Sequence, residues 1–260
     1  MKRYQAIAEY YDAEYADKQM LQEDVPFLLA HLPTRRQRIL EIATGTGRVA
    51  IPLAQAGHQV VAFDNARDML AIARRKRDSV GLGDGELELV RADALKLNLG
   101  RKFDVACVLF NTFLNFVTLE EQDRLLERVR RHLKPRGRLW IDIFNPDLEM
   151  MAEPLSVDID PSIFYVHSLD RTVQRTMDIE RNNVDQRQHI TFKYCWYDMQ
   201  GNAHLEEVAF DLTFMFPREL RLLLERHGFE VVSLWGDYDG SELTDESPRI
   251  ICDARLKRSR

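Results

Sequence analysis

Two glycines and a carboxylate near the start of the chain have a spacing that suits the binding of a nucleoside. Gly45 and Gly47 lie in the run Thr44-Gly45-Thr46-Gly47, and Asp64 follows the next apolar run. Glycine lets a backbone approach a ligand without a side chain in the way, and the N-terminus of a following helix adds a positive partial charge. A carboxylate at the end of the next strand suits the two hydroxyls of a ribose. These residues therefore predict a nucleoside-binding unit.

Such a unit needs a strand, a turn, a helix and a second strand, and the apolar pattern supplies them. Residues 39–42 predict a short buried strand, residues 48–55 have helical spacing, and residues 60–63 predict the second strand. The first strand contains Glu41. A charge inside a buried strand is costly unless it has a local role, so Glu41 is a candidate site residue.

The alternation of strands and helices continues along the first half of the chain. Residues 66–80 and 119–133 are predicted helices, whereas residues 87–91, 103–110 and 139–144 are predicted strands. Alternating elements of this kind indicate the α/β class with helices on both faces of the sheet. We therefore expect a doubly wound, mostly parallel, seven-stranded Rossmann-like sheet, preceded by an N-terminal helical arm.

The pattern changes after residue 146. Segments that alternate polar and apolar side chains, as antiparallel strands with one solvated face do, occur at residues 163–169, 172–179, 189–197 and 206–214. A last predicted helix and two strands follow, at residues 217–227, 229–234 and 249–254. We therefore expect the arm and core sheet at residues 1–146, a small antiparallel β insertion that covers the site at 147–214, and the completion of the core sheet at 215–260.

Composition excludes several classes of partner. The 260 residues carry a net charge of −6, which argues against nucleic acid or an anionic membrane as a partner. No apolar stretch is long enough to span a bilayer. The three cysteines, Cys107, Cys195 and Cys252, are far apart and predict neither a metal site nor a disulfide framework. We expect a cytoplasmic protein that acts on a small molecule, with a homodimer as a possible assembly.

Two classes of nucleoside ligand compete for the glycine turn. The run from Gly45 to Ala50 matches the dinucleotide pattern G-x-G-x-x-A, with Asp64 at the ribose position, and this predicts an NAD-dependent oxidoreductase. Other features oppose that interpretation: Glu41 lies within the first strand, and the third predicted strand ends in Asp93. The chain also lacks a second α/β half for the other nucleotide.

Taken together, these motifs resemble those of the class I S-adenosylmethionine-dependent methyltransferases. The first motif of that family is E/D-x-G-x-G-x-G, and here it reads Glu41-Ile42-Ala43-Thr44-Gly45-Thr46-Gly47, with alanine in place of the first glycine. The resemblance implies that Asp64 holds the ribose, Met69 lies against the adenine, and Asp93 with the Ala94 backbone contacts the adenine amine. The expected cofactor is S-adenosyl-L-methionine, with S-adenosyl-L-homocysteine as its product.

The arm and the β insertion resemble those of small-molecule methyltransferases that act on aminosugars and other natural products. The arm motif Y-D-x-x-Y of these enzymes corresponds here to Tyr11 and Tyr15. The resemblance implies that the cofactor-binding residues are Tyr11, Lys18, Glu41, Ala43, Thr44, Gly45, Gly47, Asp64, Asn65, Met69, Asp93, Ala94 and Phe110. It also implies that Tyr15 faces the reacting groups, and we expect Tyr15 and Asn111 to be catalytic. Residues beyond the carboxyl ends of the strands should form the acceptor floor, which predicts substrate contacts from Phe113 and Asn145, and a shared strand face predicts further contacts from Tyr194 and Trp196.

The expected reaction is an in-line displacement that moves a methyl group to a nitrogen or oxygen of the acceptor. Alignment and exclusion of water are the main tasks of the protein in such a reaction, so an obvious catalytic dyad is not required. Each assignment has a structural alternative: Tyr11 and Tyr15 at helical spacing can be core residues, and Asn111 can cap the next helix. An NAD-dependent oxidoreductase and a non-catalytic S-adenosylmethionine-binding protein remain as alternative functions.

Overall fold

The structure, a computed structural model, describes residues 7–16 and 18–257. Its core is a seven-stranded sheet with the strand order β10-β11-β5-β4-β1-β2-β3, in which β11 alone is antiparallel to its neighbours. The strands are β1 (Arg38–Ile42), β2 (Gln59–Asp64), β3 (Leu87–Arg91), β4 (Phe103–Val108), β5 (Leu133–Phe144), β10 (Phe229–Trp235) and β11 (Arg249–Leu256). The predicted fold class is confirmed.

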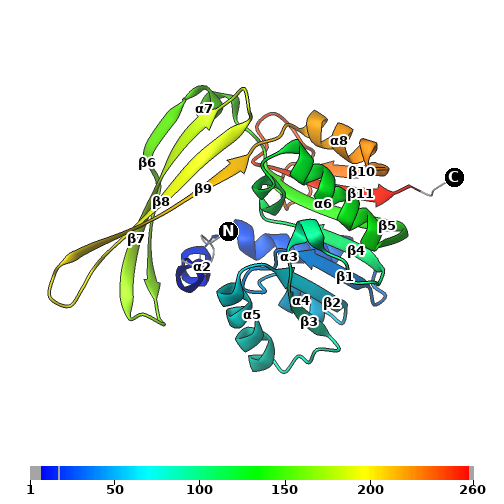
Figure 1. The fold of residues 1–260 in the computed structure, drawn as a ribbon, viewed down its shortest axis with the longest axis horizontal. Coiled ribbons are helices and arrows are strands. Elements are labelled where there is room, and N and C mark those ends of the chain that lie inside the picture. The colour runs from blue at the N-terminus through cyan, green and yellow to red at the C-terminus, as the bar shows by residue number, and fades with distance from the viewer. Residues whose placement is uncertain (1–6, 17, 258–260) are drawn as a thin grey trace.

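Helices cover both faces of this sheet (Figure 1). The apolar sides of α6 (Leu119–His132) and α8 (Pro217–Arg226) belong to one buried cluster. Those of α3 (Met20–His31), α4 (Ala50–Gln55) and α5 (Arg67–Ser79) belong to a second cluster on the other face. Because both faces are covered, the central strands are apolar almost throughout, as in other parallel sheets.

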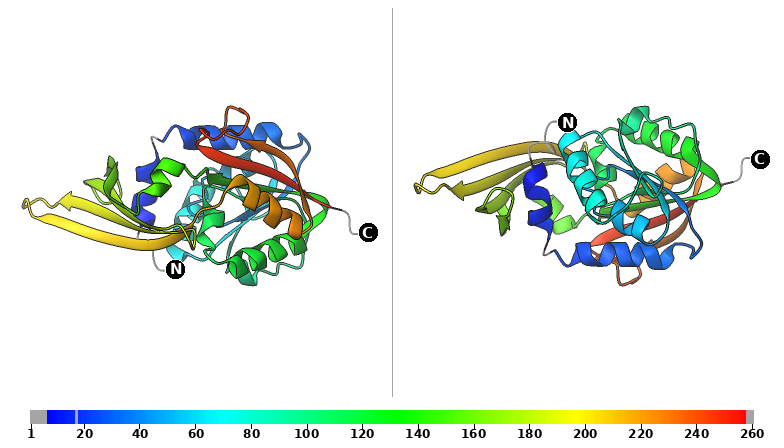
Figure 2. Two further views of the ribbon diagram at one scale, coloured as in Figure 1. Left: turned by 90° about the horizontal axis from the view of Figure 1, so that it is seen from above. Right: turned by 90° about the horizontal axis from the view of Figure 1, so that it is seen from below.

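A second sheet is attached to one end of the core. Its four antiparallel strands are β6 (Leu155–Val166), β7 (Arg171–Asn182), β8 (Arg187–Tyr197) and β9 (Ala203–Thr213), in that order. A short helix, α7 (Leu148–Ala152), leads into it. In the two views of Figure 2 this curved sheet projects from the core, with the arm helix α2 (Ala8–Tyr15) between them.

Two differences from the sequence-based expectations have local causes. Strand β4 ends at Val108, because Phe110 and Asn111 have positive φ angles of 52° and 60° that an extended strand cannot adopt. Strand β6 begins at residue 155 rather than 163, and two register shifts in its first half hide the period of two. Helix α7 was not predicted.

The arm is only partly described. Residues 1–32 were predicted to be helical, and the described part forms α2 and α3, whereas residues 1–6 and 17 lie outside the described residues. Among the helices of residues 7–16 and 18–257, none is long and apolar enough to cross a membrane.

Candidate active site

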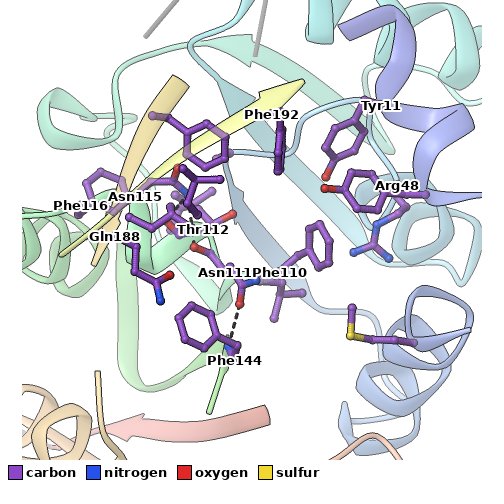
Figure 3. A pocket seen from close by; sticks show the side chains of 18 of the residues that line it. Tyr11, Arg48, Phe110, Asn111, Thr112, Asn115, Phe116, Phe144, Gln188 and Phe192 are labelled. Atoms are coloured by element: carbon purple, nitrogen blue, oxygen red, sulfur yellow. Dashed lines mark hydrogen bonds between the residues drawn. The ribbon is translucent and has the colours of Figure 1, made fainter. Parts of the chain in front are cut away.

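A cavity of about 960 Å³ opens at the carboxyl ends of the parallel strands. The second sheet and the arm complete its walls, and its volume is near the upper end of the ~300–1,000 Å³ range of ligand sites. Figure 3 shows side chains from the arm, the core and the second sheet meeting in it. The predicted site residues that line it are Tyr11, Tyr15, Lys18, Glu41, Ala43, Asp64, Asn65, Asp93, Ala94, Phe110, Asn111 and Asn145.

Asp64 joins the end of β2 to the glycine turn that follows β1. Its Oδ2 accepts the Gly45 N–H at 2.8 Å and its Oδ1 accepts the Ala66 N–H at 2.8 Å. Burial raises the pKa of this carboxyl group, and the backbone N–H donors act in the opposite direction. The carboxylate is thereby fixed at the strand end with lone pairs that can still accept hydroxyl donors.

Glu41 lies in β1 and faces the same cavity. Its Oε2 accepts the hydroxyl of Thr44 at 2.7 Å. Burial raises its pKa to about 7, while the Thr44 hydrogen bond and nearby Arg48 lower it. A carboxyl group with this pKa changes its charge near neutral pH, so Glu41 is suited to a cationic ligand group.

The glycine turn is shaped by positive φ angles. Ala43, Gly45 and Gly47 have φ angles of 56°, 57° and 81°. A Cβ atom at Gly47 would lie 3.1 Å from Ile51 Cδ1, so this glycine allows the turn to pack against the following helix. Ala43 lines the cavity, whereas Thr44, Gly45 and Gly47 do not; Thr44 donates a hydrogen bond to Glu41, and Gly45 donates one to Asp64.

The floor of the cavity follows β4, at Phe110 and Asn111. The Asn111 side chain does not cap the next helix: its Oδ1 accepts the Phe144 N–H at 2.8 Å (Figure 3). The Phe110 N–H donates to Asp142 Oδ2 at 3.1 Å. Asp142 in turn accepts from Arg249 Nε at 2.5 Å.

Asp142 and Arg249 were not identified from the sequence. Each is a charged residue in an apolar run, W-I-D-I-F and R-I-I-C. A charge in such a run was the sequence feature that could have identified them. Both side chains are almost completely buried, so their charges must be paired locally. They lie under the floor and hold its backbone.

The arm supplies an aromatic wall. Tyr11 and Tyr15 have ring centroids 4.8 Å apart, and Tyr15 meets the edge of Phe110 at 5.3 Å. The guanidinium of Arg48 lies over the same Phe110 ring, 5.4 Å from its centroid. Asp12, between the two tyrosines in the chain, accepts the Thr46 hydroxyl at 2.7 Å and so fastens the arm to the glycine turn.

Arg175 of β7 is a further cavity residue that sequence reasoning missed. Its Nε lies 3.0 Å from Glu14 Oε1 of the arm, and its Nη2 lies 2.8 Å from Asp160 Oδ2. Tyr194 of β8 donates its hydroxyl to the second oxygen of Glu14 at 3.1 Å. The second sheet is therefore joined to the arm through a buried ion pair.

Besides Thr44, Gly45 and Gly47, four predicted site residues are not part of the cavity wall. Met69 and Phe113 are buried in apolar clusters, because their helical turns face the core. Tyr194 does share a strand face with cavity residues, but the arm covers it and its ring lies 4.9 Å from that of Tyr10. Trp196 is farther along the strand and stacks on His204 at 5.4 Å.

Known proteins with related sequences and structures point to one family. A family model described as a methyltransferase domain matches residues 39–137. The chain is 30% identical to the cypemycin N-terminal methyltransferase of a Streptomyces species over 228 residues, which cover 87% of this chain and 86% of that one.

Two solved structures share the whole fold. An S-adenosylmethionine-dependent methyltransferase from Clostridium acetobutylicum matches with a TM-score of 0.78 at 17% identity, covering 98% of this chain and 99% of that chain. A sugar N-methyltransferase from a Streptoalloteichus species matches with a TM-score of 0.70 at 21% identity, covering 96% and 92%. The chain belongs to the S-adenosylmethionine-dependent methyltransferases.

Proposed function

We propose that this methyltransferase modifies an amine of a small molecule that binds between the core and the second sheet. The observation that carries the proposal is the continuity of the cavity, which is lined both by Asp64 and Asp93 near the strand ends of the core and by Phe192 of the second sheet. Two ligands can therefore lie side by side in one enclosure. The related enzymes named above as N-terminal and sugar N-methyltransferases support an amine as the acceptor.

The residues around β1, β2 and β3 have the chemistry that S-adenosylmethionine needs. Asp64 would accept the ribose hydroxyls, Asp93 and the Ala94 backbone would contact the adenine, and Glu41 would pair with the ammonium group. Lys18 and Tyr11 of the arm would contact the methionine end. When bound, the cofactor supplies a methyl group already activated by the sulfonium.

The chain contributes alignment and exclusion of water. Tyr15 and Asn111 lie where the two halves of the cavity meet, and we propose that they orient the acceptor amine for in-line displacement. We propose that the 147–214 segment is a lid that, with the arm, keeps water from this point. The amine attacks through its lone pair as the neutral base, after an ammonium form has lost its proton to solvent, and we propose that the Tyr15 hydroxyl orients it by accepting a hydrogen bond from its N–H.

The remaining expectations enter as parts of the same proposal. The free cysteines Cys107, Cys195 and Cys252 fit a reducing compartment such as the cytoplasm. A net charge of −6 and the acidic cavity favour a small acceptor over nucleic acid. A homodimer remains a proposal to be checked by light scattering.

The function is tested by calorimetry followed by turnover. Titration with S-adenosylmethionine, S-adenosylhomocysteine and NAD should give binding of the first two alone. The protein is then incubated with S-adenosylmethionine and a panel of primary amines and their hydroxyl analogues. It should release S-adenosylhomocysteine only with the amines. Methylation of the hydroxyl analogues would exclude the amine, and cofactor binding without turnover on any acceptor would favour a binding protein.

A further inference from the structure

The part of the cavity beneath the second sheet is apolar. Side chains two apart on a strand share a face, and one face of β7, β8 and β9 is directed at the cavity. The residues on that face that line the cavity are Met177, Ile179, Ile190, Phe192, Phe210 and Leu212. Register places Ile190 directly between Ile179 and Phe210, so these side chains form one continuous patch.

The core supplies a matching apolar wall. Phe116 follows the floor of the site, Phe144 ends β5, and Met151 belongs to α7; all three line the same cavity. In Figure 3, Phe116 and Phe144 lie on the same side of the cavity as Gln188 and away from Arg48. We call the space between this wall and the six residues of the sheet the lid compartment.

Positive charge in the cavity is already paired. Among the described residues that line it, the cations are Lys18, Arg48 and Arg175. Lys18 pairs with Asp160, and Arg48 pairs with Asp24 at 2.7 Å. Two guanidinium nitrogens of Arg175, Nε and Nη1, are without a hydrogen bond, but Nε lies 3.0 Å from Glu14 Oε1 and Nη2 lies 2.8 Å from Asp160 Oδ2, so the charge is paired.

Negative charge is in excess. Eight carboxylates line the cavity among the described residues, against these three cations. Four of the eight come from segments other than β1, β2 and β3, and no ion pair joins them to a cation among the described residues: Glu121, Asp147, Asp245 and Glu246. A phosphate or diphosphate group would meet this excess without a free cation to bind it, whereas an ammonium group would be attracted.

We infer that the acceptor is an amphipathic amine: an uncharged apolar group in the lid compartment, an amine at Asn111 and Tyr15, and no phosphate. This inference rests on the proposed amine acceptor and adds the chemical class of the rest of the molecule. It separates this chain from an enzyme for nucleotide-linked sugars, although a sugar N-methyltransferase shares its fold.

Binding and turnover of a homologous series test the inference separately from the proposed function. Propylamine, pentylamine, heptylamine and phenylethylamine are titrated into the protein saturated with S-adenosylhomocysteine, next to glucosamine 6-phosphate and UDP-glucosamine. Affinity should rise by about fourfold for each methylene that the compartment buries. Equal affinity along the series, or tighter binding of either phosphate-bearing amine, would overturn the inference. Tail-dependent binding without methylation would uphold it and reject the proposed reaction.

A pair of substitutions on one strand locates the effect. Ile190→Trp fills the lid compartment, whereas Thr191→Trp adds the same bulk to the opposite face of β8. Ile190→Trp should abolish the dependence of amine affinity on tail length and leave S-adenosylhomocysteine affinity unchanged. Thr191→Trp should keep the dependence on tail length and the wild-type S-adenosylhomocysteine affinity. If Ile190→Trp fails to fold, Ile190→Ala should weaken heptylamine binding more than propylamine binding. Equal losses for both amines would place the tail elsewhere.

Discussion

Asp142 and Arg249 form a buried ion pair directly beneath the floor of the active site, with Arg249 Nε 2.5 Å from Asp142 Oδ1. The other carboxylate oxygen accepts the Phe110 N–H at 3.1 Å and the Tyr238 hydroxyl at 2.6 Å. Arg249 also donates to Asn111 Oδ1 at 3.3 Å. The pair therefore contacts both residues of the floor, one through its backbone and one through its side chain.

This arrangement stabilises a backbone conformation that is unfavourable by itself. Phe110 and Asn111 are consecutive non-glycine residues with positive φ, which costs about 1–3 kcal/mol for each. The hydrogen bonds from the buried pair and from Phe144 offset that cost. Positive φ turns Phe110 towards Tyr15 and Arg48, where the arm and the cofactor half of the cavity meet.

Removal of one hydroxyl should loosen the floor. Tyr238→Phe removes one hydrogen bond to the buried Asp142 carboxylate and should lower the free energy of unfolding by about 1–3 kcal/mol. It should also lower kcat more than it changes the affinity for S-adenosylmethionine, since Asp64 and Glu41 are untouched. Denaturant melts, calorimetry and kinetics check this, with the exposed Tyr197→Phe as control. An unchanged kcat in a destabilised Tyr238→Phe protein would show that the hydrogen bonds around Asp142 contribute to stability and not to turnover.

Asp64→Ala should weaken S-adenosylmethionine binding by about 1–3 kcal/mol, because the ribose hydroxyls lose a buried charged acceptor. Calorimetry measures the change in affinity. Melting of the protein without ligand measures the separate loss of stability from the missing hydrogen bonds to Gly45 and Ala66. Asp68→Ala, a few residues away on α5, is the matched control and should bind normally. Equal affinity of Asp64→Ala and wild type would remove Asp64 from the ribose site.

Glu41 should make folding and cofactor binding depend on pH in opposite directions. Its folded pKa of about 7 is raised above the usual 4.5, so its protonated form contributes stability below about pH 4.5, and that contribution is lost as the pH rises through 7. Glu41→Gln should therefore be more stable than wild type at pH 8, by about 1–3 kcal/mol.

Binding of S-adenosylhomocysteine should respond the other way, because its ammonium group pairs with ionised Glu41. Wild-type affinity should rise by about eightfold from pH 6 to 7.5, the change in the ionised fraction of an acid with this pKa. Glu41→Gln should give a weaker and flat profile, and the exposed Glu120→Gln should follow wild type. A flat wild-type profile would separate Glu41 from the ammonium group.

Ala43 occupies a position that favours glycine. With φ at 56°, its Cβ is strained, and Ala43→Gly should stabilise the protein by up to about 1 kcal/mol. Ala71→Gly, in the exposed interior of α5, should instead destabilise it by about 0.5–1 kcal/mol. Thermal melts of both variants decide this, and a loss of stability in Ala43→Gly would show that the methyl group makes a contact that matters more than the strain.

The parts of the site that lie next to each other in the chain were predictable, and those assembled from distant segments were not. Asp64 ends β2 and Asp93 lies two residues after the end of β3, and parallel strands bring such ends to one edge. By contrast, Arg175 reaches the cavity through pairing of β7 within a separate sheet, and nothing in the local pattern specifies where that sheet docks.

Side-chain direction was the second limit. Phe113 is close to Asn111 in the chain and was assigned to the floor, but the turn of helix at residues 112–115 directs it into the core. Tyr194 lies on the predicted face of β8, and the arm rather than a ligand covers that position. The alternation of side chains along a strand predicts which face of the sheet a residue is on. Which element packs on that face depends on the tertiary structure.

The ion pair between Glu14 and Arg175 should hold the arm closed over the cavity. Glu14→Gln keeps an oxygen for the Tyr194 hydroxyl but leaves Arg175 with Asp160 alone, so we expect a loss of about 1–3 kcal/mol in stability and faster hydrogen exchange in α2. Glu9→Gln, on the exposed side of the same helix, should change neither. Because Tyr11 and Tyr15 are on α2, weaker S-adenosylhomocysteine binding should accompany the faster exchange. Faster exchange with undiminished affinity would show that the arm encloses the site without contacting the cofactor.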